Sequence, residues 1–327
     1  MDLQIDTLST EDLLNLIVNG HPDLHGSAAS VAKENFGRKV FFRALIEISS
    51  YCHNGCYYCG LRAGNKLARR YRMSMDEILR CCDTAASQGY RTFVLQGGED
   101  PVQDDEWITG LVSKVRKEFP ECAITLSVGE RSDEAYRLFK EAGADRYLLR
   151  HETASGEHYS RLHPGTMSLE NRKRCLRTLE ALGYQTGAGM MIGSPFQRPE
   201  DLVEDLLFLR ELHPHMIGVG PFIPAAGTPF ENEVNGSIEL TLRILSILRL
   251  MFPHANMPAT TALASLSPSG DLQGLAAGAN VIMTDFTPKE SREKYSIYDH
   301  KSPSDHDLRR YEDAGWVISM ERGDNFI

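Results

Sequence analysis

Three cysteines stand close together directly after an apolar segment of the chain. Cys52, Cys56 and Cys59 have the spacing Cys-x3-Cys-x2-Cys. A cuboidal 4Fe-4S cluster normally takes four thiolates, so three close cysteines without an evident fourth predict a cluster with one incompletely ligated iron. Metal chemistry takes place at such open positions. We therefore expect one 4Fe-4S cluster, bound by these three cysteines, whose free iron binds and activates a small molecule.

A structural zinc site is the main alternative for this cysteine group. Such a site needs four Cys or His ligands, usually in separated pairs, and His53 directly adjoins Cys52, too close for both to bind one ion with ease. Packing or disulfide cysteines fit less well, because the segment is rich in Gly, Asn and His and is typical of a loop after a strand. The iron-sulfur interpretation is favoured.

The cysteine spacing resembles that of the radical S-adenosylmethionine (SAM) superfamily, and the aromatic Tyr58 before the third cysteine fits the same pattern. The resemblance implies an enzyme whose free iron binds the amino and carboxylate groups of SAM. One electron, from a reduced flavodoxin or ferredoxin, then splits SAM into methionine and a 5'-deoxyadenosyl radical. The protein's task is to bind, orient and shield the reactants, since the cofactor carries the difficult chemistry.

Length and charge limit the kind of protein that carries this site. The 327 residues, 42% of them hydrophobic, suffice for one large single-core domain. A net charge of -10 and a pI near 5.6 argue against nucleic acid or an anionic membrane as the main partner. We find neither an export signal pattern nor an apolar stretch of transmembrane length, so we expect a cytoplasmic protein.

The four remaining cysteines fall in predicted helices or strands, where free cysteine usually packs as a small apolar residue. They are Cys81, Cys82, Cys122 and Cys175. An odd total of seven cysteines fits a reducing compartment better than a disulfide framework.

Short apolar runs alternate with amphipathic segments along most of the chain. This pattern is typical of an α/β fold, a (β/α)8 TIM barrel, with an open doubly wound sheet as the alternative. The predicted strands are residues 41–48, 92–96, 123–127, 146–149, 186–191, 216–219, 257–261 and 280–283. The predicted connecting helices are residues 75–88, 104–119, 132–142, 168–182, 199–212 and 238–250.

The barrel is expected to have an extension at each end. A capping-box pattern at Ser9 and a helix over residues 27–36 that ends at Gly37 predict an N-terminal helical extension, residues 1–40. The barrel then occupies residues 41–300. The charged residues 301–327 are predicted to form a C-terminal extension packed on the barrel, with a helix and a last short segment between 302 and 322.

Catalytic groups of a TIM barrel collect at the C-terminal ends of its strands. The cysteine loop follows the first predicted strand, and the run Gln96-Gly97-Gly98-Glu99 follows the second. Paired glycines let the backbone approach a ligand, and a glutamate accepts hydrogen bonds from an ammonium group. Alone, these glycines would indicate only a tight turn. Arg150 and Glu152, which follow the fourth predicted strand, would alone indicate only a polar rim with ordinary ion pairs.

The Gly-Gly-Glu run resembles the superfamily segment that holds the SAM amino group. Longer stretches between residues 43 and 298 are similar to the HydE branch, the maturases of iron-iron hydrogenases. With the strand-end positions, this resemblance implies that the cofactor-binding residues are Tyr58, Gln96, Gly97, Gly98, Glu99, Ser127, Glu152, Arg172 and Met216. The substrate cavity is expected to be lined by Arg150, Thr260, Thr261 and Tyr295.

The HydE resemblance also implies a substrate. The radical is directed at the sulfur of an iron-bound cysteine in an iron carbonyl cyanide precursor, on the path to the hydrogenase H-cluster. Other hydrogenase maturation factors would be partners. Two departures stand out: no cysteine follows Cys175, which argues against a second cluster, and the turn at residues 193–197 differs from the usual Gly-x-Pro-Gly-Gln.

Three other functions remain open. Methylornithine synthase and biotin synthase are also similar, so a carbon-skeleton rearrangement or a sulfur insertion is the enzymatic alternative. Biotin synthase would need further cysteines for an auxiliary cluster. A non-catalytic iron-sulfur carrier or scaffold is the third, although a carrier usually completes four-cysteine ligation and has no need of a Gly-Gly-Glu run.

Overall fold

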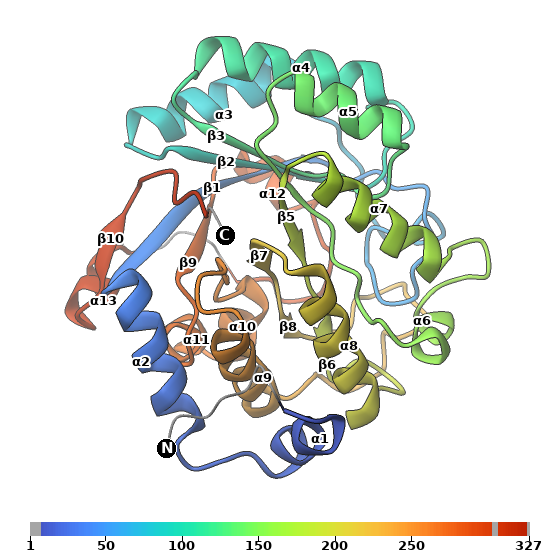
Figure 1. Cartoon of the computed structure of the whole chain (residues 1–327). Helices are drawn as coiled ribbons and strands as arrows, with labels where there is room; N and C mark the ends of the chain where they lie inside the picture. The colour runs from blue at the N-terminus through green and yellow to red at the C-terminus, as the bar shows by residue number, and fades with distance from the viewer. Residues whose placement is uncertain (1–7, 303–306, 326–327) are drawn as a thin grey trace.

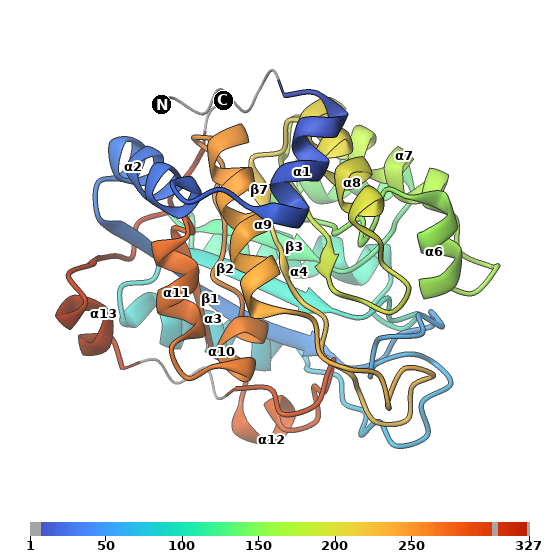
Figure 2. The same cartoon turned by 90° about the horizontal axis from the view of Figure 1, so that it is seen from below.

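Parallel strands curl into a barrel whose outside is covered by helices (Figures 1 and 2). The computed structural model describes residues 8–302 and 307–325. Neighbouring strands follow chain order, so each crossover helix returns the chain to the next parallel strand. The expected α/β barrel is confirmed. Its strands are β1 (Lys39–Ser49), β2 (Thr92–Gly97), β3 (Ala123–Ser127), β4 (Arg146–Leu148), β5 (Gln185–Ala188), β7 (Met216–Ile217) and β9 (Val281–Asp285).

The position between β7 and β9 is filled by residues 256–258, which are not a regular strand. Asn256 makes a single parallel bridge with Met216, and Pro258 makes one with Val281. Proline has no N–H to donate, so the ladder is interrupted there. The predicted strand over 257–261 was therefore wrong, because these residues form no regular strand and only Pro258 among them makes an isolated bridge. Thr261 instead begins the helix α10 (Thr261–Leu266).

The six predicted connecting helices are confirmed, each to within a residue or two. Most begin at a Ser or Asp whose side chain accepts a hydrogen bond from the first turn, as at Ser74 and Asp104. They are α3 (Met75–Ser87), α4 (Asp105–Glu118), α5 (Asp133–Glu141), α7 (Leu169–Ala181), α8 (Pro199–Leu212) and α9 (Ile238–Met251). Within the described residues, four short helices were not predicted, namely α6 (Gly156–Leu162), α10, α11 (Gly270–Ala276) and α12 (Lys289–Arg292).

Two helices precede the barrel and pack on its outer helices. The helix α1 (Thr10–Asn19) begins with the expected capping box at Ser9 and contacts α8, and α2 (Leu24–Phe36) contacts α9. Arg243 of α9 donates to the carbonyl oxygen of Ile17 at 2.7 Å. Figure 2 shows α1 beside α8 and α2 beside α9.

The C-terminal residues return to the N-terminal half of β1. The helix α13 (Arg309–Asp313) precedes β10 (Val317–Ser319), which pairs with β1 from Lys39 to Phe41. Beyond β10, the Asp324 carboxylate accepts a 2.7 Å hydrogen bond from the buried guanidinium of Arg146. A helix and a short segment were expected here, and both are present; residues 303–306 of that prediction lie outside the described residues.

Three small elements complete the fold. The strands β6 (Met191–Ile192) and β8 (Gly220–Pro221) pair beyond the C-terminal ends of β5 and β7, and α12 (Lys289–Arg292) follows β9. Among the described residues, no helix is long and apolar enough to cross a membrane.

Candidate active site

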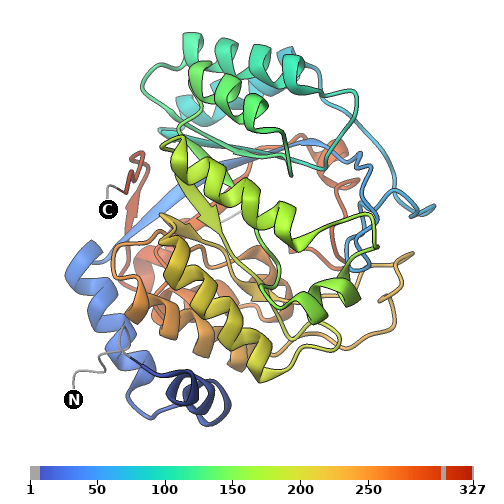
Figure 3. The ribbon, with the colours of Figure 1, turned by 45° about the vertical axis from the view of Figure 1, so that its right-hand side comes forward.

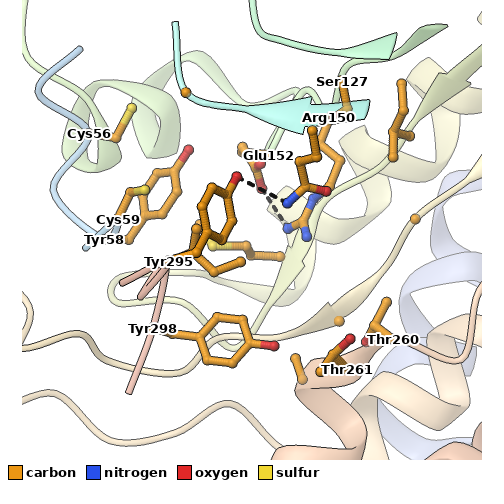
Figure 4. Close-up of a pocket in the computed structure, with 18 of the residues that line it drawn as sticks. Cys56, Tyr58, Cys59, Ser127, Arg150, Glu152, Thr260, Thr261, Tyr295 and Tyr298 are labelled. Carbon is orange, nitrogen blue, oxygen red and sulfur yellow. Dashed lines mark hydrogen bonds and ion pairs between the residues drawn. The ribbon is translucent and has the colours of Figure 1, made fainter. Parts of the chain in front are cut away.

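A cavity of about 360 Å³ lies at the C-terminal ends of the strands. Figure 4 shows Cys56, Tyr58 and Cys59 on one side of it, Thr260 and Thr261 on another, and Tyr295 between them. Of the sixteen residues predicted for the site, all but one line this cavity. They are Cys52, Cys56, Tyr58, Cys59, Gln96, Gly97, Gly98, Glu99, Ser127, Arg150, Glu152, Arg172, Thr260, Thr261 and Tyr295.

Met216 is the predicted residue that does not line the cavity. It lies in β7, 4% exposed, and its sulfur atom accepts a 3.3 Å hydrogen bond from Nη1 of Arg43 inside the barrel. In this position it packs the interior below the cavity.

The cysteine loop is fixed by close contacts with the rest of the chain. The guanidinium of Arg70 donates to the carbonyl oxygens of Leu61 and Arg62 at 2.9 and 2.8 Å and also to that of Ser50. A Cβ atom on Gly98 would lie 2.3 Å from the carbonyl oxygen of Tyr51 and 2.6 Å from Cβ of Cys52. Glycine is therefore required at position 98 if the loop is to approach β2 this closely.

The cysteine thiols fit an anionic donor set for a cationic group. Burial raises the pKa of Cys59 to about 12, and it raises that of Cys56 further. The nearby charges of Cys52 and Cys59 also raise the pKa of Cys56, so the three thiols lie close enough to interact. Thiolates in such surroundings need a compensating positive charge, which iron supplies.

The arrangement of the thiols differs from that of ligands around one ion. In the part of the chain that the structure describes, no three Cys, His, Asp or Glu side chains surround a point where a single metal ion would bind. In a four-iron cluster each cysteine binds a different iron atom, and the sulfur atoms stand further apart.

The short helix α6 and the turn after it form the wall behind Tyr58 and Cys56. The Tyr58 hydroxyl lies 3.2 Å from Nε2 of His163, whose ring stacks on that of Tyr159 at 3.9 Å. Burial lowers the pKa of His163 to about 3, so its imidazole is neutral at pH 7. Sδ of Met167 lies 3.7 Å from Sγ of Cys56. Sequence reasoning missed these residues, because nothing local distinguished α6 from a loop.

Charged residues after β4 form the opposite side of the cavity. Arg150 donates to the Glu152 carboxylate at 2.7 Å, and Nη1 of Arg172 donates to the carbonyl oxygen of Arg150 at 2.6 Å. Arg172 also forms an ion pair with Glu130 at 2.5 Å. Through these two bonds the guanidinium of Arg172 positions this turn at the cavity wall.

Glu99 links the glycine run to the neighbouring loop after β3. Its Oε1 accepts a 2.8 Å hydrogen bond from the backbone N–H of Glu130. Gly129, at φ +80°, allows this approach, since a Cβ atom there would lie 2.0 Å from Cγ of Glu99. The second carboxylate oxygen lies 3.5 Å from Nε2 of His53.

A second polar group, not predicted from the sequence, lies on the β1 side of the cavity. Glu47 and Lys301 both line the cavity and form an ion pair, and Nζ of Lys301 lies 3.7 Å from a carboxylate oxygen of Asp285. Burial raises the pKa of Glu47 to about 8. A glutamate inside the apolar run 41–48 was the available signal, because a charge in a buried strand needs a partner or a function.

Comparison with known proteins identifies the class of enzyme. Residues 46–209 match the Radical SAM superfamily. The chain belongs to this superfamily and is a radical SAM enzyme.

Within the superfamily, the chain is similar to the FeFe hydrogenase maturase subunit HydE of Thermotoga maritima. The two are 47% identical over 274 residues, which cover 84% of this chain and 78% of the relative. The chain is also 32% identical to 3-methylornithine synthase of Methanosarcina barkeri, over 89% of this chain and 83% of that one. The crystal structure of methylornithine synthase (PylB) superposes with a TM-score of 0.83 at 29% identity, covering 97% of this chain and 96% of the other.

Proposed function

We propose that this radical SAM enzyme matures the metal site of an FeFe hydrogenase, as HydE does. The observation that carries the proposal is the 47% identity to HydE over most of both chains. The proposed substrate is an iron carbonyl cyanide complex with a bound cysteine, and the proposed partners are the other maturation factors. We also propose the cytoplasm as its location and a reduced flavodoxin or ferredoxin as the electron donor.

In this proposal the cysteine loop holds one 4Fe-4S cluster through Cys52, Cys56 and Cys59. When bound, the cluster and SAM together supply a 5'-deoxyadenosyl radical. The proposed SAM-binding residues line the rest of the cavity wall. Glu99 offers a carboxylate, the glycine run lets the backbone approach the ligand, and Glu152 adds a second carboxylate. Arg172 positions the turn that carries Glu152, through its bond to the Arg150 carbonyl oxygen.

The proposed substrate end is formed by Arg150, Thr260, Thr261 and Tyr295. Arg150 offers a guanidinium that an anionic complex would bind, although Glu152 already takes one of its nitrogens. The buried hydroxyl of Thr260 has no hydrogen-bond partner among the described residues. A buried polar atom without a partner costs free energy, and a ligand in the cavity would supply that partner.

Methylornithine synthesis is the second candidate. It is supported by the TM-score of 0.83 over 97% of the chain and by the 32% identity to 3-methylornithine synthase. The identity to HydE is higher over a similar share of the chain, and we therefore place hydrogenase maturation first.

Two experiments test the proposal. The protein is reconstituted anaerobically with iron and sulfide, reduced with dithionite and incubated with SAM; formation of 5'-deoxyadenosine is expected, and Cys56→Ala should abolish it together with cluster binding. The gene is then expressed in cells that lack HydE but contain an FeFe hydrogenase. Restored hydrogen production supports the proposal. Failure there, with 3-methylornithine formed from a basic amino acid in vitro, would favour the second candidate.

A further inference from the structure

The segment that follows the cysteine loop is strongly basic in an otherwise acidic protein. Residues 60–72, the basic segment, hold five of the chain's 35 lysines and arginines and none of its 45 aspartates and glutamates. The chain as a whole carries a net charge of -10. The five cations thus begin within three residues of Cys59, the last of the proposed cluster ligands.

The basic segment is bonded directly to the loop that carries the cysteines. The N–H of Ala63 donates to the carbonyl oxygen of Asn54 at 2.8 Å, and the guanidinium of Arg62 donates to that of Gly55 at 3.3 Å. The N–H of Arg62 also donates to the carbonyl oxygen of Cys59 at 3.0 Å. The basic segment is therefore in direct contact with the loop that carries the proposed cluster ligands.

Different members of the segment have different tasks. Arg62 and Arg70 bind backbone carbonyls, and Arg72 is paired with Asp100 at 2.6 Å. Lys66 and Arg69 are exposed, and neither forms an ion pair with any described residue. Between them lies Leu67, of which 67% is exposed.

The segment lies on the outside of the molecule. Figure 3 shows the chain after β1, in light blue, forming an outer loop on the side of the barrel that carries α6. Asn65 anchors it there, because its side-chain amide donates to the carbonyl oxygens of Gly60 and Ala226 at 2.8 and 2.9 Å. The exposed cations are thus presented to solvent on a fixed backbone.

We propose that the basic segment is the docking surface for the protein that delivers the electron, and that this partner is a small electron carrier with an acidic surface around its redox centre. The proposal rests on the proposed three-cysteine cluster of this radical SAM enzyme and is independent of its substrate. An acidic carrier is repelled by the net charge of -10 and attracted to the basic segment, which steers the encounter. An exposed leucine flanked by two unpaired cations suits the small, transient interfaces of redox partners.

The test is the rate at which a reduced flavodoxin reduces the reconstituted cluster, followed by stopped-flow absorbance without SAM or substrate. The test variant is Lys66→Glu/Arg69→Glu, which leaves the loop-binding Arg62 and Arg70 intact. The matched control is Lys114→Glu/Lys117→Glu on α4, which makes the same change of charge at exposed positions away from the cysteine loop. Both are compared with the parent at about 20 and about 300 mM salt, because the higher concentration screens attraction between exposed charges much more strongly.

We expect the bimolecular rate constant to fall at least tenfold in the test variant at low salt, and to change less than threefold in the control. At high salt the rate constants of the parent and the test variant for reduction by flavodoxin should become similar. The rate of reduction by dithionite should stay within twofold in all three proteins. Equal rates in parent and test variant, or equal losses in test and control variants, would overturn the proposal. If the glutamate variant fails to bind the cluster, Lys66→Gln/Arg69→Gln replaces it, with a threefold loss as the threshold.

This experiment separates the docking surface from the proposed function. A parent protein that binds no cluster, or forms no 5'-deoxyadenosine with dithionite and SAM, contradicts the proposed function. A parent that cleaves SAM with dithionite, and whose test variant is reduced by flavodoxin at the parental rate, contradicts only the docking surface.

Discussion

Arg150 and Glu152 form an ion pair of 2.7 Å directly after β4, where the chain has left the regular strand. Glu152 adopts φ +67°, a left-handed conformation uncommon for residues other than glycine. Its backbone N–H donates to the carbonyl oxygen of Gly189 at 3.0 Å. The strained turn therefore fixes a carboxylate at the cavity wall.

Replacement of Glu152 should weaken SAM binding without unfolding the protein. We expect Glu152→Ala to lower the affinity of the reconstituted enzyme for SAM at least tenfold, because a carboxylate facing the cavity is lost, while the melting temperature changes little. Equilibrium dialysis measures the affinity. Glu157→Ala, at an exposed position of α6, is the control and should bind SAM as the parent does. Unchanged affinity in Glu152→Ala would remove this residue from the proposed SAM site.

A single methyl group at position 98 should displace the cysteine loop. Gly98→Ala places Cβ 2.3 Å from the carbonyl oxygen of Tyr51, far inside van der Waals contact. We expect iron content after reconstitution to fall to less than half that of the parent. Gly26→Ala, within helix α2 and with no atom within 4 Å of its added Cβ, is the control and should load iron normally.

The buried carboxylate of Glu47 should make stability depend on pH in an unusual direction. Burial raises its pKa from 4.5 to about 8, so the folded protein holds a proton that the unfolded chain has released. Between these values the folding free energy contributed by Glu47 is lost as pH rises, by up to about 1.4 kcal/mol for each pH unit. Chemical denaturation of parent and Glu47→Gln from pH 5 to 8 measures this. The parent should lose stability relative to the variant; a constant difference would contradict the raised pKa.

The hydrogen bond between Tyr58 and His163 should be measurable by a double-mutant cycle. His163→Phe removes the partner of the Tyr58 hydroxyl, and we expect the free energy of unfolding to fall by about 1–3 kcal/mol. Tyr58→Phe in the same background should then cost less than it does in the parent. The coupling energy expected is about 1 kcal/mol, and a value near zero would show that the two groups do not depend on each other.

The cysteine loop after β1 and the strand ends could be predicted from the sequence because both are local patterns. The three cysteines stand within one loop, and Gln96 and Glu152 follow strands whose apolar runs are plain. A parallel barrel brings such strand ends to one rim whatever the details of its helices. That is why the cavity contains residues as distant as Tyr58 and Tyr295 without any contact having been predicted individually.

The features that were missed depend on contacts between distant parts of the chain. Lys301 meets Glu47 across 254 residues, and no pattern near either residue indicates the other. His163 lies after a seven-residue helix too short for a clear apolar period. Pro258 interrupts a strand whose neighbours are regular, and Met216 lies on β7 below the rim that its neighbours reach.

The pairing of β1 has a consequence for the order of events during synthesis. Residues 44–49 of β1 pair with β2 as soon as that strand is made, whereas Phe41 to Leu45 also require β9, and the first residues require β10. On the ribosome, the strand that leads into the cysteine loop therefore waits for residues 281–319 before its last neighbours emerge. Contacts so distant in sequence form slowly. Iron and sulfide can then enter a completed site only after residues 281–319 have been made.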